Sequence, residues 1–180
     1  MHGILETERL LLRPPQAADI GHFVPLLNDF DVSRYLSRVP HPYTEDDGCA
    51  FVVKAADERD RGDDHVFVIL RKTDRVLIGM CGVHPILGFE MGYWIGKSYW
   101  GHGYATEAAR RVVAFAFQEL DAAEVIAGWF QDNPTSGRVL EKLGFRPLRT
   151  EERVSISRGH AVYCHLMGME RAAFEATRTA

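Results

Sequence analysis

The sequence predicts a mixed α/β fold of the α+β type, in a single domain over residues 1–180. Three observations predict it. Strand-like runs precede, interrupt and follow the helical segments, three such runs follow one another closely in the middle of the chain, and a strongly amphipathic helix comes next. A chain of 180 residues is long enough to bury a hydrophobic core.

The first third of the chain predicts one strand followed by helices. Residues 3–14 are predicted to form a strand, and residues 17–29 carry apolar side chains at helical spacing, interrupted by Pro25. Residues 31–37 are predicted to form a second, short helix. Thr44 with the acidic residues after it is typical of a helix start, so a third helix is expected from there toward residue 61.

The middle of the chain predicts an antiparallel meander. Residues 65–72, 76–85 and 89–96 are rich in Val, Ile, Phe, Tyr and Trp and are separated by short polar turns. Residues 104–120 then place Ala, Val and Phe on one helical face.

The last third predicts a strand, a helix and a closing hairpin. Residues 124–130 form the strand, and a helix follows in which Asn133 can cap the start and Gly144 can end it. The segments "RVSISRG" and "HAVYCHLMGM" are predicted to pair as a hairpin over residues 153–169.

Composition excludes several classes of protein. The net charge of −4 argues against a nucleic-acid surface, because phosphate binding usually requires a basic patch. No segment has the ~20 apolar residues of a membrane span, and the first residues lack a basic leader, so we expect no membrane partner and a cytoplasmic location. Three widely spaced cysteines indicate neither a disulfide framework nor a metal site.

The segment "YWGHGYATEAAR" predicts an anion site. Gly101 and Gly103 stand directly before the helix that begins near Tyr104, and the first N–H groups of a helix are unpaired and lie at its positive end. The dinucleotide pattern GxGxxG fails at Thr106, and no GK[ST] follows for a P-loop. The alternative is that the glycines only permit a tight turn into the helix.

Three landmarks, "ETERLLLRP", "GYWIGKSYWGHGYATEAA" and "NPTSGRVLEKLGF", occur in an order that covers nearly the whole chain. With them the chain resembles the GNAT superfamily of acyl-CoA-dependent N-acetyltransferases, and within it the RimJ/RimL group, which acetylates the N-termini of ribosomal proteins. The resemblance implies the GNAT fold, with a mostly antiparallel central sheet flanked by helices on both faces. It also implies acetyl-CoA as cosubstrate and no metal.

The resemblance implies where acetyl-CoA binds. The family's phosphate loop, [RQ]xxGx[GA], falls on residues 100–105, with Trp where the general pattern has Arg or Gln. Backbone amides of this loop would hold the pyrophosphate, the preceding strand would pair with the pantetheine arm, and Asn133 would add a hydrogen bond or act only as a helix cap. The expected binding residues are Trp94, Ile95, Gly96, Trp100, Gly101, His102, Gly103, Tyr104, Ala105, Thr106 and Asn133.

Acetyl transfer to an amine needs a base and a proton for the departing thiolate. An α-amino group, with a pKa of about 7.7 to 8.0, needs less help from a base than a lysine at about 10.4. Glu90 matches a family position whose Glu acts on the amine, commonly through water, and His84, His102, His160 and His165 are rivals. The alternative for Glu90 is an ion pair with an Arg.

The thiolate needs a different group. The family's usual Tyr falls on Leu140, which cannot donate a proton, so Ser136 on the first turn of the same helix is the candidate acid. Its alternative is a polar residue of the first turn without a chemical role. Cys81 is predicted to lie in the core, so direct attack in a ternary complex is favoured over an acetyl-cysteine.

The sequence therefore predicts an acetyl-CoA-dependent N-acetyltransferase that modifies a primary amine, either a protein N-terminus or a small molecule. The alternatives are a catalytically inactive CoA- or nucleotide-binding regulatory module and a plain interaction protein. The expected acceptor-binding residues are Tyr35, Arg38, Trp94 and Tyr163. An edge strand of the meander would allow a homodimer.

Overall fold

A computed structural model describes residues 3–85 and 88–179, and an eight-stranded sheet runs through it in the order β1-β2-β3-β4-β5-β6-β8-β7. Among the described strands, β5 and β6 form the one parallel pair, and all other neighbours are antiparallel. The strands are β1 (Leu5–Glu6), β2 (Leu10–Arg13), β3 (His65–Arg71), β4 (Leu77–His84), β5 (Phe89–Ile95), β6 (Glu124–Phe130), β7 (Arg146–Ser155) and β8 (His160–Glu170).

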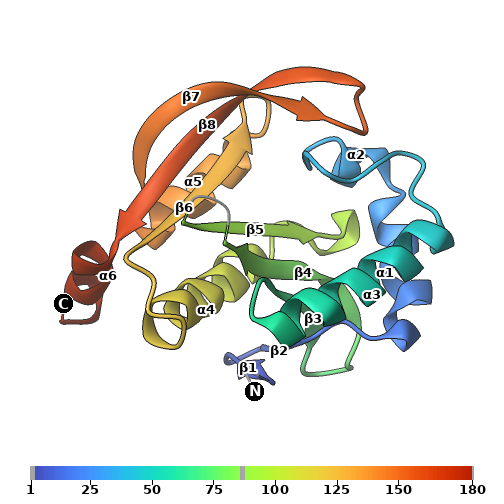
Figure 1. The fold of residues 1–180 in the computed structure, drawn as a ribbon, viewed down its shortest axis with the longest axis horizontal. Helices are drawn as coiled ribbons and strands as arrows, with labels where there is room; N and C mark the ends of the chain where they lie inside the picture. The colour runs from blue at the N-terminus through green and yellow to red at the C-terminus, as the bar shows by residue number, and fades with distance from the viewer. Residues whose placement is uncertain (1–2, 86–87, 180) are drawn as a thin grey trace.

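Helices cover both faces of this sheet, which confirms the predicted fold class (Figure 1). The helices are α1 (Ile20–Leu27), α2 (Phe30–Ser33), α3 (Glu45–Arg61), α4 (Tyr104–Gln118), α5 (Pro134–Leu143) and α6 (Arg171–Thr179), with short 3-10 turns η1 (Ala17–Asp19) and η2 (Lys97–Tyr99). In the described part of the chain, no helix is both long and apolar enough to cross a lipid bilayer.

Strand β3 shows how alternation divides the core in two. Phe67 and Ile69 pack in the cluster that contains the apolar face of α4, whereas Val68 and Leu70 pack in the cluster that contains the buried residues of α1 and α3. Successive side chains of a strand point to opposite faces, so one strand serves both layers.

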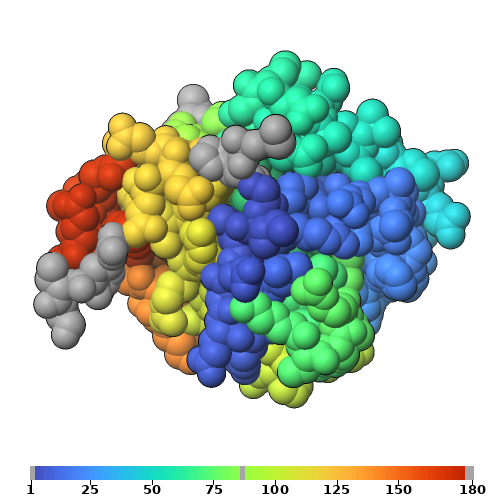
Figure 2. Space-filling model, turned by 90° about the horizontal axis from the view of Figure 1, so that it is seen from below, coloured from blue at the N-terminus to red at the C-terminus, as the bar shows by residue number. Residues whose placement is uncertain are grey.

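The N-terminal strand prediction was wrong in one respect. Residues 3–14 form two short antiparallel strands, because the chain turns at Thr7, whose N–H donates to the Leu10 carbonyl. Seen from below, this N-terminal segment lies beside α4 (Figure 2). Lys72, just after β3, donates a hydrogen bond to the Thr7 carbonyl and so holds the turn from the other side.

The predicted helices form with small changes of length. Residues 17–29 divide into η1 and α1, and α1 ends two residues after Pro25. Helix α3 begins as predicted, because Thr44 and Asp47 form a capping box at its N-terminus.

The meander of β3, β4 and β5 is confirmed, but it does not supply an edge strand. Strand β2 pairs with β3 and β6 pairs with β5, so the meander lies inside the sheet and the outer strands are β1 and β7. The closing hairpin is confirmed and extends from Arg146 to Glu170. Helix α6, which follows it, was not predicted.

The sheet splits between β5 and β6. These strands pair only at Phe89 with Val125 and at Glu90 with Ile126, and among the described residues β5 beyond Glu90 has no β6 partner. Figure 1 shows the two strands diverging from this point. The split leaves an opening between the two halves of the sheet.

Candidate functional site

A cavity of about 1050 Å³ runs through the split. Its walls come from β4, β5, β6, the start of α4 and α5, the inner side of α3, and the segment after α2. It contains most of the predicted site residues, namely Glu90, Ser136, Trp94, Ile95, Trp100, Gly101, Gly103, Tyr104, Ala105, Thr106, Asn133, Tyr35 and Arg38. In the described part of the chain, the lining does not include Gly96, His102 or Tyr163.

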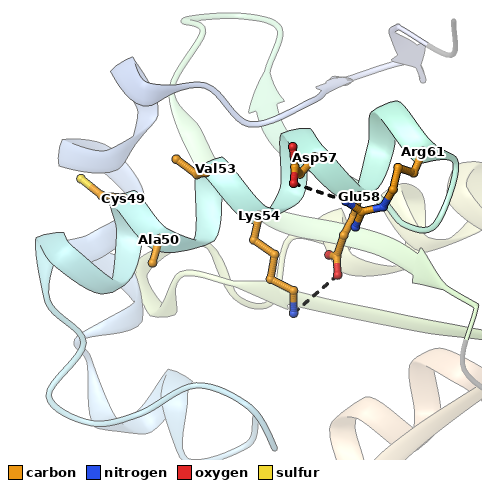
Figure 3. A pocket seen from close by; sticks show the side chains of 7 residues that line it. All are labelled: Cys49, Ala50, Val53, Lys54, Asp57, Glu58 and Arg61. Carbon is orange, nitrogen blue, oxygen red and sulfur yellow. Dashed lines mark hydrogen bonds and ion pairs between the residues drawn. The ribbon is translucent and has the colours of Figure 1, made fainter.

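A second hollow lies along α3 and shares Ala50, Lys54 and Glu58 with the lining of the cavity (Figure 3). All the residues that line it come from this helix, and two ion pairs one turn apart cross it: Lys54 with Glu58 at 3.7 Å and Arg61 with Asp57 at 3.3 Å. Such pairs on an exposed helix stabilise it by only ~0.3–0.5 kcal/mol. This hollow is therefore a solvated helix surface, and the cavity in the split is the candidate site.

The glycine loop has the conformation that its sequence predicts. Gly101 and Gly103 both have φ of +80°, in the left-handed region where a side chain is strained. Gly103 is the N-cap of α4 and provides no side-chain cap, so the loop leads directly to the positive end of a 15-residue helix. The predicted turn into the helix is therefore present, and the same two glycines leave room for the predicted anion site.

Neighbouring side chains hold this loop in place. The Arg9 guanidinium donates to the His102 carbonyl at 3.0 Å and lies over the Tyr104 ring, while its Nε donates to Glu107 at 2.7 Å. The His102 ring nitrogen Nδ1 lies 2.8 Å from the Trp100 carbonyl. His102 therefore supports the loop from outside the cavity.

Trp100 braces the strand that leads to the loop. Its indole N–H donates to the Ile95 carbonyl at 2.7 Å, and the Gly96 N–H donates to the Ile78 carbonyl on β4 at 2.8 Å. These two backbone groups, both in the stretch expected to pair with pantetheine, already have partners within the protein.

The start of α5 brings Asn133, Ser136 and a residue that sequence analysis missed into one cluster. The Asn133 carboxamide accepts from the Ser136 N–H at 3.3 Å, which confirms its capping role. The Ser136 hydroxyl lies 2.8 Å from the hydroxyl of Tyr93 on β5. Burial raises the pKa of Tyr93 to about 12, so this phenol is neutral and able to donate a hydrogen bond at neutral pH.

Glu90 is held by an arginine from the far side of the split. Arg153 Nη1 on β7 donates to Glu90 Oε1 at 2.5 Å and Nη2 lies 3.5 Å from Oε2. The guanidinium crosses β6 at Gly128, where an added Cβ would lie 3.6 Å from Arg153 Nη1 and 2.8 Å from Cys164 Sγ. Arg153 also pairs with Glu151 at 2.8 Å.

Of the four rival histidines, His84 alone lines the cavity within the described chain. Its Nδ1 lies 2.7 Å from the Asp64 carboxylate. His160 contacts the Arg158 carbonyl in the exposed hairpin turn, and His165 contacts Thr150 and the Trp129 ring.

The remaining residues for which the sequence makes a prediction are Leu140, Cys81 and Tyr163. Leu140 is buried in the core, as is Cys81, whose thiol has its pKa raised well above the ordinary value by burial. Tyr163 is 51% exposed on β8. Among the described residues, no group of three His, Cys, Asp or Glu side chains could hold a metal ion.

Tyr93, Arg153 and Asp64 were missed because each acts through a partner distant in the sequence. Tyr93 lies 43 residues from Ser136, Arg153 lies 63 from Glu90, and Asp64 lies 20 from His84. The one available signal was the position of Tyr93 in the strand that precedes the glycine loop.

Comparison with known proteins gives one family. The model of the Acetyltransferase (GNAT) domain matches residues 9–146. The uncharacterized N-acetyltransferase YnaD of Bacillus subtilis (strain 168) is 30% identical over 146 residues, which cover 79% of this chain and 82% of that protein.

Solved structures share the fold. The crystal structure of a GNAT-family acetyltransferase from Bacillus anthracis aligns with a TM-score of 0.80 and 25% identity, over 94% of this chain and 99% of that one. RimL, a ribosomal L7/L12 alpha-N-protein acetyltransferase in complex with coenzyme A, aligns with a TM-score of 0.80 at 16% identity, over 93% and 97% of the two chains.

Proposed function

Because the chain belongs to the GNAT family of acetyltransferases, we propose that it is a member of the RimJ/RimL group that acetylates a primary amine by direct attack in a ternary complex. The protein is an acyltransferase that uses acetyl-CoA. One observation carries the proposal: a single cavity joins the glycine loop at the start of α4 to Ser136 and Glu90 through the split in the sheet.

The residues present fit acetyl-CoA. The glycine loop offers N–H groups at the positive end of α4, which suits a pyrophosphate. The split offers a strand edge along β5, and an extended, amide-containing arm can bind there as an added strand would. In this proposal the acetyl group lies near Ser136, on the first turn of α5.

Ser136 is the proposed proton donor to the thiolate. Its hydroxyl lies at the positive end of α5, where a developing negative charge is stabilised. Tyr93 stands behind it at 2.8 Å and can donate to the serine oxygen while the serine proton is directed to the sulfur. Tyr93 thus supplies the hydroxyl that Leu140 lacks, from a strand in place of a helix.

Glu90 lies on the acceptor side of the proposed site. Both of its oxygens face Arg153, so a proton taken up by Glu90 would displace one of these contacts. In the proposal, Tyr35, Arg38 and Trp94 contact the acceptor, because they line the same cavity as Glu90. Tyr163, which we also expected to contact the acceptor, lies outside it.

The acceptor class follows from likeness to the group. RimL is described as acting on the N-terminus of a ribosomal protein, and an α-amino group needs only a weak base. We therefore propose a peptide N-terminus as the first acceptor to test, with small-molecule amines as the second class.

Isothermal titration with acetyl-CoA tests the binding site. Gly103→Trp should abolish saturable binding, because it fills the loop and strains a position with φ of +80°. Gly21→Ala is the matched control, since Gly21 lies on α1, has no left-handed φ and has open space around it. Absence of binding by the folded wild type would overturn the proposal.

Release of free thiol then tests turnover. The wild type is expected to release CoA from acetyl-CoA in the presence of a peptide with a free N-terminus or one of a panel of primary amines. Tight binding without release on any of them would favour the inactive regulatory module.

A further inference from the structure

A histidine and an aspartate form a pair on the acceptor side of the cavity. His84 is the last residue of β4, and Asp64 directly precedes β3. His84 Nδ1 lies 2.7 Å from the Asp64 carboxylate, and the two side chains are only 17% and 16% exposed. Asp64 Oδ1 also accepts from the His65 N–H at 2.7 Å, so the carboxylate is held by the backbone.

This contact determines which imidazole nitrogen carries a lone pair. An ionised carboxylate only accepts hydrogen bonds, so Nδ1 of His84 must be the donor. In the neutral ring Nε2 is then unprotonated and can accept a proton. A second group that fixes the tautomer in this way is the arrangement by which a histidine is prepared as a general base.

The free nitrogen faces the cavity. An added Cβ at Gly92 would lie 4.0 Å from His84 Nε2, and, apart from the two chain neighbours of Gly92, no other described residue comes within 4 Å of that Cβ position. Gly92 is exposed and lines the cavity together with His84 and Asp64. Nε2 therefore lies near Gly92, a lining residue that has no side chain of its own.

Glu90 lies next to this nitrogen on the same face. His84 and Glu90 are opposite each other in the register of β4 and β5, and opposite residues in an antiparallel pair point to the same side. Arg153 donates a hydrogen bond to Glu90 from the other side of the split. The other charged residues in the described lining are Arg38, Asp47, Lys54, Glu58, Asp132 and Lys142, of which Lys54 and Glu58 pair with each other at 3.7 Å.

We propose that His84, oriented by Asp64, is the general base that takes the proton from the acceptor amine. In this scheme the ion pair of Glu90 with Arg153 sets the electrostatic potential around His84. The inference rests on the proposed acetyltransferase function. His84 is a catalytic residue in this scheme, and Asp64 is a positioning residue.

The protons balance as follows. His84 Nε2 removes one proton from the acceptor ammonium, and the neutral nitrogen attacks the thioester carbonyl carbon. The N–C bond forms and the C–S bond breaks, Ser136 protonates the sulfur, and the second proton lost by the nitrogen restores Ser136. The products are the acetylated amine and CoA thiol, and His84 releases one proton to solvent.

Kinetics with two kinds of amine test the proposal. The probes are an alanyl peptide or spermidine, which are largely protonated at pH 7, and hydroxylamine, which is largely neutral there. His84→Gln is expected to lower kcat/KM by about 100-fold for the protonated probe and much less for hydroxylamine. The affinity for acetyl-CoA, measured by calorimetry, should not change.

The pH profile separates a base from a merely structural residue. Imidazole changes its protonation state between about pH 5 and 8. The fall of kcat/KM on the acid side of the wild-type profile should move, in His84→Gln, to the pKa of the acceptor amine itself, because without the base only the neutral amine reacts. Asp64→Asn should reduce kcat/KM and disturb the profile, because an amide can favour the other tautomer. His22→Gln, an exposed histidine on α1, is the matched control.

The outcomes distinguish the two proposals. An active wild type with His84→Gln within twofold of it for the protonated probe would overturn the base but leave the acetyltransferase intact. An acid limb that moves to the pKa of the amine in Glu90→Gln, but stays in place in His84→Gln, would assign the base to Glu90. A wild type that turns over neither probe would contradict both proposals.

Nitrogen NMR gives a readout without an acceptor. In the neutral ring of His84, the ¹⁵N shifts should show a protonated Nδ1 and an unprotonated Nε2, and Asp64→Asn should alter this pattern. The opposite tautomer in the wild type would overturn the proposal.

Discussion

Ser136 and Tyr93 show how one hydroxyl depends on another. Ser136 is fixed at the backbone by Asn133 and at the side chain by Tyr93, so its hydroxyl has a defined direction before any ligand binds. Donors oriented in advance stabilise a developing charge without the cost of reorganisation. The pair therefore acts as a unit in the proposed reaction.

Substitution of this pair gives the first prediction. Ser136→Ala should lower kcat by about 100-fold, as loss of a general acid does. Tyr93→Phe should lower it about fivefold, because a neutral hydrogen bond contributes ~1 kcal/mol. The double variant should be no worse than Ser136→Ala alone, since Tyr93 acts through Ser136. Steady-state thiol release measures all three, and strictly multiplicative losses would contradict the coupling.

At the scale of single residues, the sequence predicts contacts and conformations that depend on residues near each other in the chain. Asn133 as a cap and Gly101 and Gly103 in a turn follow from residues within a few positions of each other. The contact of Glu90 with Arg153 does not, because 63 residues separate them and the register of four strands, β5, β6, β8 and β7, brings them together. The alternative of an ion pair with an Arg was foreseen for Glu90, but its partner could not be.

At the scale of elements, the start of α4 is tied to the N-terminal turn. Glu107 accepts from the Thr7 hydroxyl at 2.6 Å, the Arg9 N–H at 2.9 Å and Arg9 Nε at 2.7 Å. Burial opposes ionisation of this carboxyl, but the hydrogen bonds from Thr7 and Arg9 prevail and lower the pKa of Glu107. Two segments about 100 residues apart thus hold the glycine loop.

Glu107→Gln gives the second prediction. A group whose pKa is lowered on folding stabilises the fold above its unfolded pKa, about 4.3 for Glu, and loses this contribution as the pH falls through the folded value. The variant should lose ~1–3 kcal/mol at pH 7. The difference in Tm between wild type and variant should shrink below about pH 4.

Thermal unfolding across pH 3 to 7 measures this difference, with Glu141→Gln, an exposed glutamate of α5, as control. A Tm difference that is constant over this range would show that Glu107 does not act through its charge.

The elements themselves were predicted better than their ends. The helices at Thr44, Tyr104 and Pro134 start where their capping residues predict. The turn at Thr7, which divides residues 3–14 into two strands, does not follow from the local sequence, because Glu107 stabilises it from another part of the chain. Contacts between distant parts of the chain determine where such a strand is interrupted, and local residue propensities do not reveal the interruption.

At the scale of the molecule, the turn of the β7–β8 hairpin bends over the split toward α2 (Figure 1). The Ile156 N–H donates to the Ser37 carbonyl at 3.1 Å, and Ser157 Oγ donates to the Ser33 carbonyl at 3.0 Å. Arg158 donates to both oxygens of Asp132, at 2.9 and 3.1 Å. The first two contacts join the hairpin to α2 and the segment after it, and the third holds the hairpin to the chain that follows β6.

Asp132→Asn gives the third prediction. Burial opposes ionisation of Asp132, but Arg158 and Arg34 lower the pKa of its carboxyl, so the charged form joins the hairpin to the segment after α2. The variant should increase hydrogen exchange at the Ile156 amide about tenfold at neutral pH, because opening of this region becomes easier. The amide of Ile69, in the buried middle of β3, should not change.

The sign of the pH effect is the same as for Glu107. The contribution of Asp132 is present above its unfolded pKa and is lost as the pH falls through the lower, folded value. Exchange at Ile156 should therefore rise in the wild type on acidification and approach that of the variant. Equal exchange of the two proteins at pH 7 would contradict the role of this contact.

A ligand bound in the split would make the stability of the folded state depend on the concentration of that ligand. If β5 and β6 paired along their whole length, the backbone groups of both strands would be satisfied within the protein. In the described chain, the part of β5 beyond Glu90 has no β6 partner, so a bound ligand can supply hydrogen bonds there. A ligand held there at 100 times its Kd adds about 2.7 kcal/mol to the free energy of unfolding. On the proposed function, the lifetime of the protein in a cell would then follow the concentration of acetyl-CoA, so that the enzyme is most abundant when its donor is plentiful.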